Sequence, residues 1–425
     1  MPKRINFSKL IEKQLPPELV NFMWVAGEMA NSRGEKLYLV GGVVRDLLLE
    51  QANLDLDLVV EGNAIELAQQ LKLNKGKITT HPRFNTAKLQ WNDRSVDLAT
   101  ARSETYEKPG ALPAVTPSSI DDDLSRRDFT INAMAIRLNP GDYGKLVDPH
   151  GGRDDLQNKR IRILHEKSFT DDATRIWRAL RYEQRLDSHL EKRTLVLLQR
   201  DIPMLETISA DRIRYEIECI LKEKSPEKVF NRAHELGVLA ALHPSLKGDG
   251  GLAEKFSRAR KECSPLPPSF DLYLALLAYP LNTEEIEQLI SRLNLPKLSA
   301  KTPRDTIAIK NRMRSLSTPG VSPSAIYNLL RDFSPSALEA NSLVTQSAVA
   351  SQAIHLFLNR LKDVQVLLTG DDLIEMGIAP GPQIKEILEL LHQAKLNRKI
   401  TTRQDEEEMV KGWLAQKQGG TTPPS

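Results

Sequence analysis

The sequence predicts an α+β protein, with a small mixed or mainly antiparallel sheet in an N-terminal head and only helices after it. Residues 36 to about 150 alternate short β-type runs with short helical runs. After about residue 165 the strand signals almost disappear, and apolar residues recur at helical spacing. The 425 residues suffice for roughly two to four packed units.

The expected strands of the head are short runs rich in β-branched, apolar and aromatic residues. They are Leu37 to Val40, Asp55 to Val60, Thr86 to Gln90 and Ser95 to Thr100. Between the last two, Asn92-Asp93 is a hairpin turn signal. The segment Ala64 to Leu73 has helical periodicity.

The helical part is punctuated by proline- and glycine-rich stretches such as residues 264–268 and 317–320. The expected helices share apolar residues three or four apart, and they are Asp171–Leu186, Leu190–Asp201, Ala210–Lys222, Pro226–Leu236, Phe270–Leu277, Thr283–Leu293 and Gln383–Ala394.

Composition excludes some classes of protein and leaves others open. No apolar run approaches the roughly 18 residues that cross a bilayer, and no export signal follows Met1, so we expect a cytoplasmic protein without a membrane partner. Cys219 and Cys263 are far apart, and we expect them to be apolar fillers. A net charge of +3 does not by itself indicate nucleic-acid binding.

Two carboxylates one residue apart, Asp55 and Asp57, are the most informative feature of the chain. Alternate residues of a strand share a face, so we expect these acids on one face and Leu54, Leu56 and Leu58 on the other. Two like charges this close favour a cation between them, and Mg²⁺ accepts one or two carboxylates. The alternative is an edge strand with two solvated acids.

A glycine pair precedes these acids. Gly41 and Gly42 let the backbone approach a ligand closely, and Arg45, in the Arg45-Asp46 step one helical turn later, is predicted to reach phosphates. The alternative is a plain strand-to-helix turn.

Further polar residues fall on the next strand and beyond it. Asp97 lies between apolar neighbours and is a candidate base or third metal ligand, or else a capping or ion-paired acid. Arg127 is a candidate for binding triphosphate oxygens. Asp128 and Asn132, one turn apart if a helix starts here, are candidates for binding ribose hydroxyls or for organising the neighbouring turn. The alternative for this segment is a capped, salt-bridged helix.

The segment from Asp171 to Arg181 is the second strong signal. Asp172 and Arg175, three apart on the expected helix, present an acceptor beside a planar donor fork and can match the edge of a base. Arg178 and Arg181 continue the three-residue step and are candidates for phosphate. The alternative is an ordinary ion-paired helix.

In order and spacing, residues 39–46, Asp55 with Asp57, residues 126–133 and Asp172 with Arg175 resemble the class II tRNA nucleotidyltransferases, which are the bacterial CCA-adding enzymes and their poly(A) polymerase relatives. The resemblance is strong over residues 36 to 240 and returns at 370 to 391. It implies a catalytic nucleotidyltransferase head at 1–165, a templating neck at 166–240, a body at 241–330, a tRNA-binding tail at 331–415 and a disordered end at 416–425.

The resemblance implies that Asp55 and Asp57 hold two Mg²⁺ ions, one activating the 3′-hydroxyl of tRNA and the other steadying the triphosphate. It further implies nucleotide contacts from residues of the glycine turn, the Arg-Asp-x-x-x-Asn segment and the helix, namely Gly41, Gly42, Arg45, Asp46, Arg127, Asp128, Asn132, Asp172, Arg175, Arg178 and Arg181. Asp172 and Arg175 would select CTP or ATP without a nucleic-acid template.

The implied reaction is addition of C, C and A to tRNA 3′ ends from CTP and ATP. Addition of the terminal A alone, poly(A) tailing, or a catalytically silent RNA-binding protein are the alternatives, and the oligomeric state is open. Residues 103–119 match the family's flexible loop. The chain departs from the family pattern at Asp171, where Glu is usual, and at Glu50, where Gly is usual.

Overall fold

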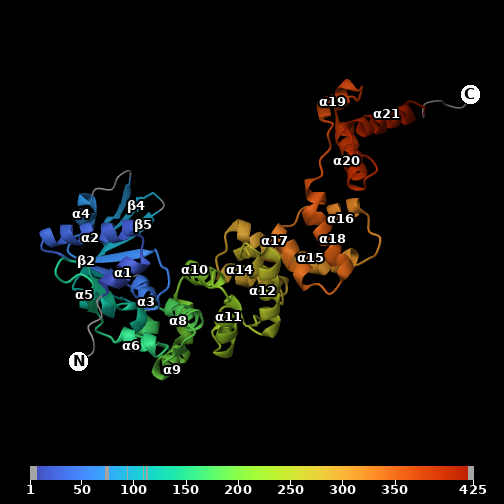
Figure 1. The fold of residues 1–425 in the computed structure, drawn as a ribbon. Coiled ribbons are helices and arrows are strands. Elements are labelled where there is room, and N and C mark those ends of the chain that lie inside the picture. Colours follow the sequence, from blue (N-terminus) through green and yellow to red (C-terminus); the bar gives the residue numbers. More distant parts are fainter. Residues whose placement is uncertain (1–6, 72–75, 93, 109, 112, 420–425) are drawn as a thin grey trace, which may run out of the picture. The chain divides into compact units, whose positions relative to one another are not determined.

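The computed structural model describes residues 7–71, 76–92, 94–108, 110–111 and 113–419. The chain divides into two compact units, Met1–Leu242 and His243–Ser425. The first holds the sheets and the second, in its described part, only helices (Figure 1). The predicted α+β class is therefore confirmed, while the finer division into head, neck, body and tail stays a prediction.

The main sheet of the first unit has seven strands in the order β3-β4-β5-β2-β1-β8-β9. Only β2 and β5 pair in parallel among its described strands, so the sheet is mixed, as predicted. The strands are β1 (Lys36–Val40), β2 (Leu56–Glu61), β3 (Lys77–His81), β4 (Thr86–Trp91), β5 (Arg94–Thr100), β8 (Ala135–Arg137) and β9 (Leu146–Val147).

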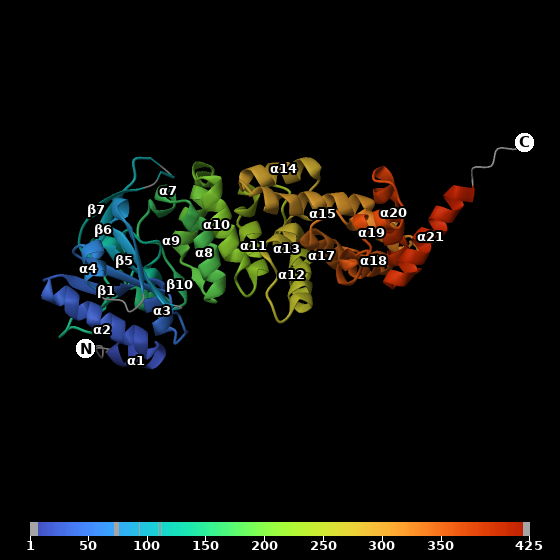
Figure 2. The ribbon, with the colours of Figure 1, turned by 90° about the horizontal axis from the view of Figure 1, so that it is seen from above.

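The two faces of this sheet differ because side chains alternate along each strand. One face carries Leu39, Leu58 and Leu98, which are fully or almost fully buried against α2 (Pro17–Ser32) and α4 (Ala64–Gln70). Figure 2 shows α2 running along the sheet. The opposite face is covered only in part, by α5 (Ile120–Ser125), and it carries Asp57.

The remaining elements of the first unit are mainly helices, with a few short strands between them. They are α1 (Ser8–Gln14), α3 (Gly42–Leu48), η1 (Pro82–Phe84), β6 (Arg102–Thr105), β7 (Ala114–Pro117), η2 (Thr130–Asn132), α6 (Gly152–Gln157), β10 (Arg160–Ile161), α7 (Ser168–Asp171), α8 (Thr174–Arg185), β11 (His189–Leu190), α9 (Lys192–Asp201), η3 (Ile202–Thr207), α10 (Ala210–Leu221), α11 (Pro226–Glu235) and η4 (Leu239–Ala241). Strands β6 and β7 form an antiparallel hairpin of their own.

Residues from Ile309 onward form two apolar clusters in the second unit, which is a series of helices. The helices are α12 (Gly250–Cys263), α13 (Phe270–Ala278), α14 (Thr283–Arg292), α15 (Lys297–Leu316), α16 (Pro323–Leu330), α17 (Pro335–Val344), α18 (Ala348–Asn359), η5 (Leu361–Asp363), α19 (Gly370–Glu375), α20 (Pro382–Leu396) and α21 (Arg403–Gly419). One cluster runs from Ile309 to Leu396 and the other from Leu368 to Val410. Across the described residues, no helix combines the length and apolar character needed to span a membrane.

Most expected elements are confirmed within a few residues, and Cys219 and Cys263 are both free thiols. The helix predicted over 171–186 was wrong at its start, because Asp172 has extended backbone angles (φ −142°, ψ 96°) and separates α7 from α8. Its Oδ1 accepts hydrogen bonds from the Thr174 N–H at 3.0 Å and the Thr174 hydroxyl at 2.6 Å. Such a local side-chain bond stabilises the break.

Smaller corrections concern strand and helix ends. β2 begins at Leu56, so Leu54 does not share the buried face and is 43% exposed. Asp128 precedes the short 3-10 helix η2 and does not lie on a helix with Asn132. Helix α21 includes residues 416–419, predicted to be disordered, while 420–425 and Asp93 lie outside the described residues. Glu50, where the family usually has glycine, has a φ of 53°, in the left-handed region that glycine adopts readily.

Candidate active site

A cavity of about 790 Å³ in the first unit brings most of the predicted site residues together. Its lining includes ten of them: Gly41, Gly42, Asp55, Asp57, Arg127, Asp128, Asn132, Asp172, Arg175 and Arg178. Four others do not line it, namely Arg45, Asp46, Asp97 and Arg181. These residues span more than 130 positions of the chain, so their proximity follows from the fold and not from local sequence.

Asp57 lies on β2 and Asp55 immediately precedes that strand. In the described part of the chain, neither carboxylate receives a hydrogen bond from another residue. Burial and the neighbouring charge of Asp55 raise the pKa of Asp57 to about 6, although Arg127 acts in the opposite direction. Two acids with uncompensated charge are a suitable donor set for a divalent cation.

The structure limits how many ligands the protein can supply to such a cation. No group of three His, Cys, Asp or Glu side chains within the described residues is placed to hold a metal. Asp55 and Asp57 would therefore provide two ligands, and water and substrate phosphates the others, which is the usual arrangement for Mg²⁺ and not for a closed structural site.

Because Gly41 has no side chain, the guanidinium of Arg127 can lie against the glycine turn. Gly41 has a φ of 75°, and a Cβ at this position would lie 2.9 Å from Nη1 of Arg127. Arg127 donates one hydrogen bond from Nη2 to Oδ2 of Asp123 at 3.0 Å, and its buried Nε has no partner among the described residues. Arg127 is thus held beside Asp57 with donors still free for an anion.

Asp128 has the opposite electrostatic environment. Its carboxylate accepts hydrogen bonds from Asn132 Nδ2 at 3.0 Å and Arg178 Nε at 2.8 Å. Burial opposes its ionisation, yet Arg178 and Asn132 lower the pKa of Asp128 to about 2. Arg178 also lies 3.7 Å from Glu216, whose pKa is raised by burial.

Arg45 lies outside the lining of this cavity and is bonded to neighbouring residues. Its Nε and Nη2 donate to both carboxylate oxygens of Asp46 at 2.8 and 3.0 Å, and Nη1 donates to Oδ1 of Asn132 at 2.7 Å. Its guanidinium also lies 5.1 Å from the ring centre of Tyr182. Both Arg45 and Asp46 are 2% exposed. This geometry fits residues that position the glycine turn and Asn132, and the phosphate contact stays a prediction.

Asp172 and Arg175 both face the cavity, but each already has partners. Besides Thr174, Arg212 donates to Oδ1 of Asp172 at 2.7 Å, whereas Oδ2 accepts nothing from the described residues. Arg175 donates to the Ser168 hydroxyl and to the Arg126 carbonyl, both at 2.7 Å. The pair is therefore fixed in place by α7, α10 and the end of α5.

Arg181, predicted to reach phosphate, lies behind the cavity wall. It is 3.5 Å from Glu216 and 3.5 Å from Glu223, and its guanidinium lies 5.0 Å from the ring centre of Tyr182. These contacts fit a residue that supports α8 against α10, and its role toward the nucleotide stays a prediction.

Sequence reasoning missed several residues of the lining, above all Arg212, Glu104 and Tyr106. The side chain of Glu104, on β6, is 7% exposed and bound by Arg102 at 3.0 Å and Arg126 at 2.9 Å. The Tyr106 hydroxyl donates to it at 2.9 Å, so burial and Glu104 raise the pKa of Tyr106. The only available signal was a dense alternation of charges in 102–107 and 211–216, which does not identify partners.

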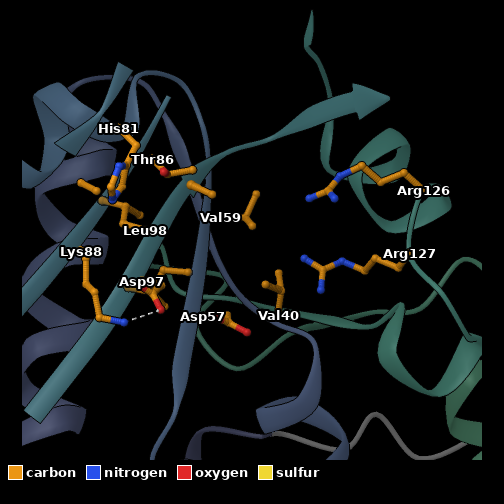
Figure 3. Close-up of a pocket in the computed structure, with 13 residues that line it drawn as sticks. Val40, Asp57, Val59, His81, Thr86, Lys88, Asp97, Leu98, Arg126 and Arg127 are labelled. Carbon is orange, nitrogen blue, oxygen red and sulfur yellow. Dashed lines mark hydrogen bonds and ion pairs between the residues drawn. The ribbon is translucent and has the colours of Figure 1, made fainter. Parts of the chain in front are cut away.

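A second cavity, of about 460 Å³, lies over the partly covered face of the sheet (Figure 3). Asp97 on β5 faces it and is paired in register with Asp57 on β2. Its carboxylate forms an ion pair with Lys88 at 3.2 Å. Asp97 is therefore adjacent to the Asp57 position, but with a protein cation already beside it.

Comparison with known proteins gives two family matches. Residues 37–162 match the poly A polymerase head domain, and residues 189–249 match the probable RNA and SrmB-binding site of polymerase A. The chain is 34% identical to the A-adding tRNA nucleotidyltransferase of Geobacter sulfurreducens, over 95% of this chain but 48% of that protein. It is 33% identical to the A-adding tRNA nucleotidyltransferase of Halalkalibacterium halodurans, over 97% of both chains.

Among solved structures, the chain resembles the Thermotoga maritima CCA-adding enzyme complexed with tRNA. The two share 32% identity with a TM-score of 0.75, over 96% of this chain and 99% of that one. The chain thus spans about half the length of one relative and nearly the whole length of the other two.

Proposed function

The chain belongs to the family of tRNA nucleotidyltransferases and poly(A) polymerases, and on this premise we propose that it adds C, C and A in turn to tRNA 3′ ends from CTP and ATP. One observation carries the proposal. One cavity is lined by two acids whose carboxylates accept no hydrogen bond, by Arg127 with donors still free, and by the Asp172–Arg175 pair, all within the described residues. Nucleotidyl transfer needs these three parts, for metal, triphosphate and base respectively.

Asp55 and Asp57 are the residues that would hold Mg²⁺, since carboxylate oxygens without protein partners suit a hard divalent cation. Bound there, the metal would supply positive charge to the attacking 3′-hydroxyl and to the departing pyrophosphate. Arg127 binds the triphosphate beside Gly41, where the absence of a side chain lets the backbone approach the phosphates. Asp97 is our candidate for accepting the proton of the 3′-hydroxyl.

Asp172 and Arg175 are proposed to read the incoming base. Cytosine and adenine both present an amino donor next to a ring-nitrogen acceptor, whereas uracil and guanine present a carbonyl next to an N–H. The unoccupied Oδ2 of Asp172 can accept from the amino group, and the guanidinium of Arg175 can donate to the ring nitrogen. We expect Asp172→Ala to impair nucleotide choice more than binding of the tRNA body.

The deciding experiment supplies tRNAs that end at the discriminator base, at C or at CC, each with labelled CTP or ATP alone and then together. CCA addition predicts that one, two or three nucleotides are added according to the starting end, after which synthesis stops. Long tails of A would instead identify a poly(A) polymerase. No product with any RNA end would identify a catalytically silent RNA-binding protein and overturn the proposal.

Addition of the terminal A alone is the second candidate, because two of the relatives compared are named A-adding enzymes. It predicts that only tRNA ending in CC is extended, by one A, and that CTP is not used. A cytoplasmic location stays a prediction.

A further inference from the structure

The second cavity lies along two rows of side chains that cross four strands of the sheet. Register pairs Asp57 with Asp97, Asp97 with Lys88 and Lys88 with Thr79. The neighbouring row contains Val59, Ala99, Thr86 and His81 in the same way. All these residues share the partly covered face because they differ by two positions along each strand.

Figure 3 shows Arg126 and Arg127 extending toward these strands from the other side of the cavity, with Asp57 between the two sides. Asp57, Arg126 and Arg127 line both cavities, so Asp57 stands at their junction. The lining of the second cavity also includes Lys88 and His81, neither of which reaches the first.

A nucleotidyl transfer has two substrates that must meet from opposite directions. The attacking oxygen and the leaving oxygen lie roughly in line through the phosphorus atom. The first cavity contains the base-reading pair and the glycine turn, and it therefore takes the nucleoside triphosphate. The attacking hydroxyl must then come from the other side of Asp57, where the second cavity lies.

We propose that this second cavity binds the 3′-terminal nucleotide of the acceptor RNA, and that Lys88 contacts its phosphate. The inference rests on the proposed function and adds a site for its second substrate. In the reaction the RNA 3′-oxygen forms a bond to the α-phosphorus, and the bond from the α-phosphorus to the oxygen that bridges to the β-phosphate breaks. Pyrophosphate leaves with that oxygen, and the proton of the 3′-hydroxyl passes to the carboxylate of Asp97.

Lys88 is suited to this contact because its present partner is a weak one. Its side chain is 41% exposed and that of Asp97 47% exposed, and an ion pair this exposed to solvent contributes little to stability. An RNA phosphate can therefore share or take the ammonium group, leaving the carboxylate of Asp97 next to the terminal ribose. His81 and Thr86, in the adjoining row, supply a ring and a hydroxyl to the same nucleotide.

The first test is a kinetic comparison of Lys88→Met with Lys77→Met. Lys77 lies on the same sheet, at the start of β3, but lines neither cavity. Loss of one phosphate contact should raise the KM for tRNA about three- to tenfold in the Lys88 variant and lower the salt dependence of tRNA binding. The KM for the nucleotide should stay within twofold, Lys88→Arg should restore most of the KM for tRNA, and Lys77→Met should behave as the wild type.

A second test locates the RNA end directly, without relying on a variant. A tRNA whose 3′-terminal residue is 2-thiocytidine is irradiated on the wild-type protein, and the labelled peptide is identified by mass spectrometry. Crosslinks within residues 77–91 that persist with excess ATP support the inference.

The outcomes separate the two proposals. A wild-type protein that extends no tRNA overturns the proposed function. A wild type that extends tRNA, with an unchanged KM for tRNA in Lys88→Met or crosslinks confined to Tyr106 and Tyr215 of the first cavity, overturns the acceptor site alone.

Discussion

Two groups of acids line the same cavity, and they are built in opposite ways. The carboxylate of Asp57, on β2, is half-buried and accepts no hydrogen bond in the described chain, and desolvation with the charge of Asp55 raises its pKa to about 6. Asp128 is buried, and Arg178 and Asn132 hold its pKa at about 2. Arg127 lies beside the first group without a hydrogen bond to it, whereas Arg178 is hydrogen-bonded to Asp128.

This difference suggests that the Asp55 and Asp57 group binds a ligand, whereas the Asp128 group supports the fold. A half-buried carboxylate without hydrogen-bond donors is costly in its charged form and becomes more favourable when a cation binds. A carboxylate that is paired and hydrogen-bonded stabilises the fold at once. The Asp128 group connects the segment after α5 to α8 and α10, and so holds the Asp172–Arg175 pair close to the acids of β2.

Among the substitutions that test this contrast, Asp57→Asn has the largest expected effect. We expect nucleotide incorporation to fall at least roughly a thousandfold, because a metal ligand is lost, while tRNA affinity and the folded state persist. Incorporation is measured with labelled ATP and tRNA binding by filter retention. Asp187→Asn, an exposed acid paired with Lys159, is the matched control and should keep full activity. Near-normal incorporation by Asp57→Asn would remove the metal assignment.

Asp128→Asn should act mainly on stability. Removing the hydrogen-bonded acid of a buried ion pair leaves Arg178 with only Glu216 at 3.7 Å, and we expect the free energy of unfolding to fall by about 3 kcal/mol. Urea denaturation followed by circular dichroism measures this change. Asp187→Asn breaks an exposed pair and should leave the free energy of unfolding close to that of the wild type. Equal effects of the two substitutions would mean that the Asp128 group is not a support.

The two acids should respond to pH in opposite directions. The raised pKa of Asp57 means that metal-free protein loses stability as pH rises from about 4 to 6, by up to about 3 kcal/mol, and added Mg²⁺ should reverse this loss. The lowered pKa of Asp128 gives stability that is present above about pH 4 and lost as pH falls toward 2. Urea titrations of the wild type and Asp57→Asn in EDTA, at pH 4.5 to 7.5, measure the first effect. A difference between them that does not grow with pH would contradict it.

The smallest expected effect is that of Thr174→Val. The Thr174 hydroxyl is one of three donors to Oδ1 of Asp172, and its loss should let the carboxylate rotate while Arg212 still holds it. We expect the preference for ATP and CTP over UTP to fall about two- to fivefold, with stability changed by about 1 kcal/mol. Competition between labelled nucleotides measures the preference. An unchanged preference would show that Arg212 and the Thr174 backbone N–H suffice to orient Asp172.

Local pattern was enough for much of the fold. The period-2 alternation in 55–60 and 95–100 predicts strands, and three- to four-residue spacing predicts the helices from Leu190 onward, because burial on one face forces these periods. The proximity of Asp55 and Asp57 likewise follows from the sequence, because alternate residues of an extended chain point to the same side. Pattern failed at element ends, as at Leu54, which precedes β2, and at Asp172, where side-chain hydrogen bonds stabilise a break between two helices.

The sequence by itself determined the fold class and the family, and it identified the two acids that we propose as metal ligands, since all three depend on residue types at short spacing. Only the tertiary structure decided which charges are satisfied. Arg45 is hydrogen-bonded to Asp46 and Asn132, and Asp97 forms an ion pair with Lys88. Oδ1 of Asp172 accepts a hydrogen bond from Arg212, whereas the carboxylate of Asp57 accepts none in the described chain. The strength of a charge in a protein depends on what lies within a few ångströms, and segments distant along the chain supply those neighbours.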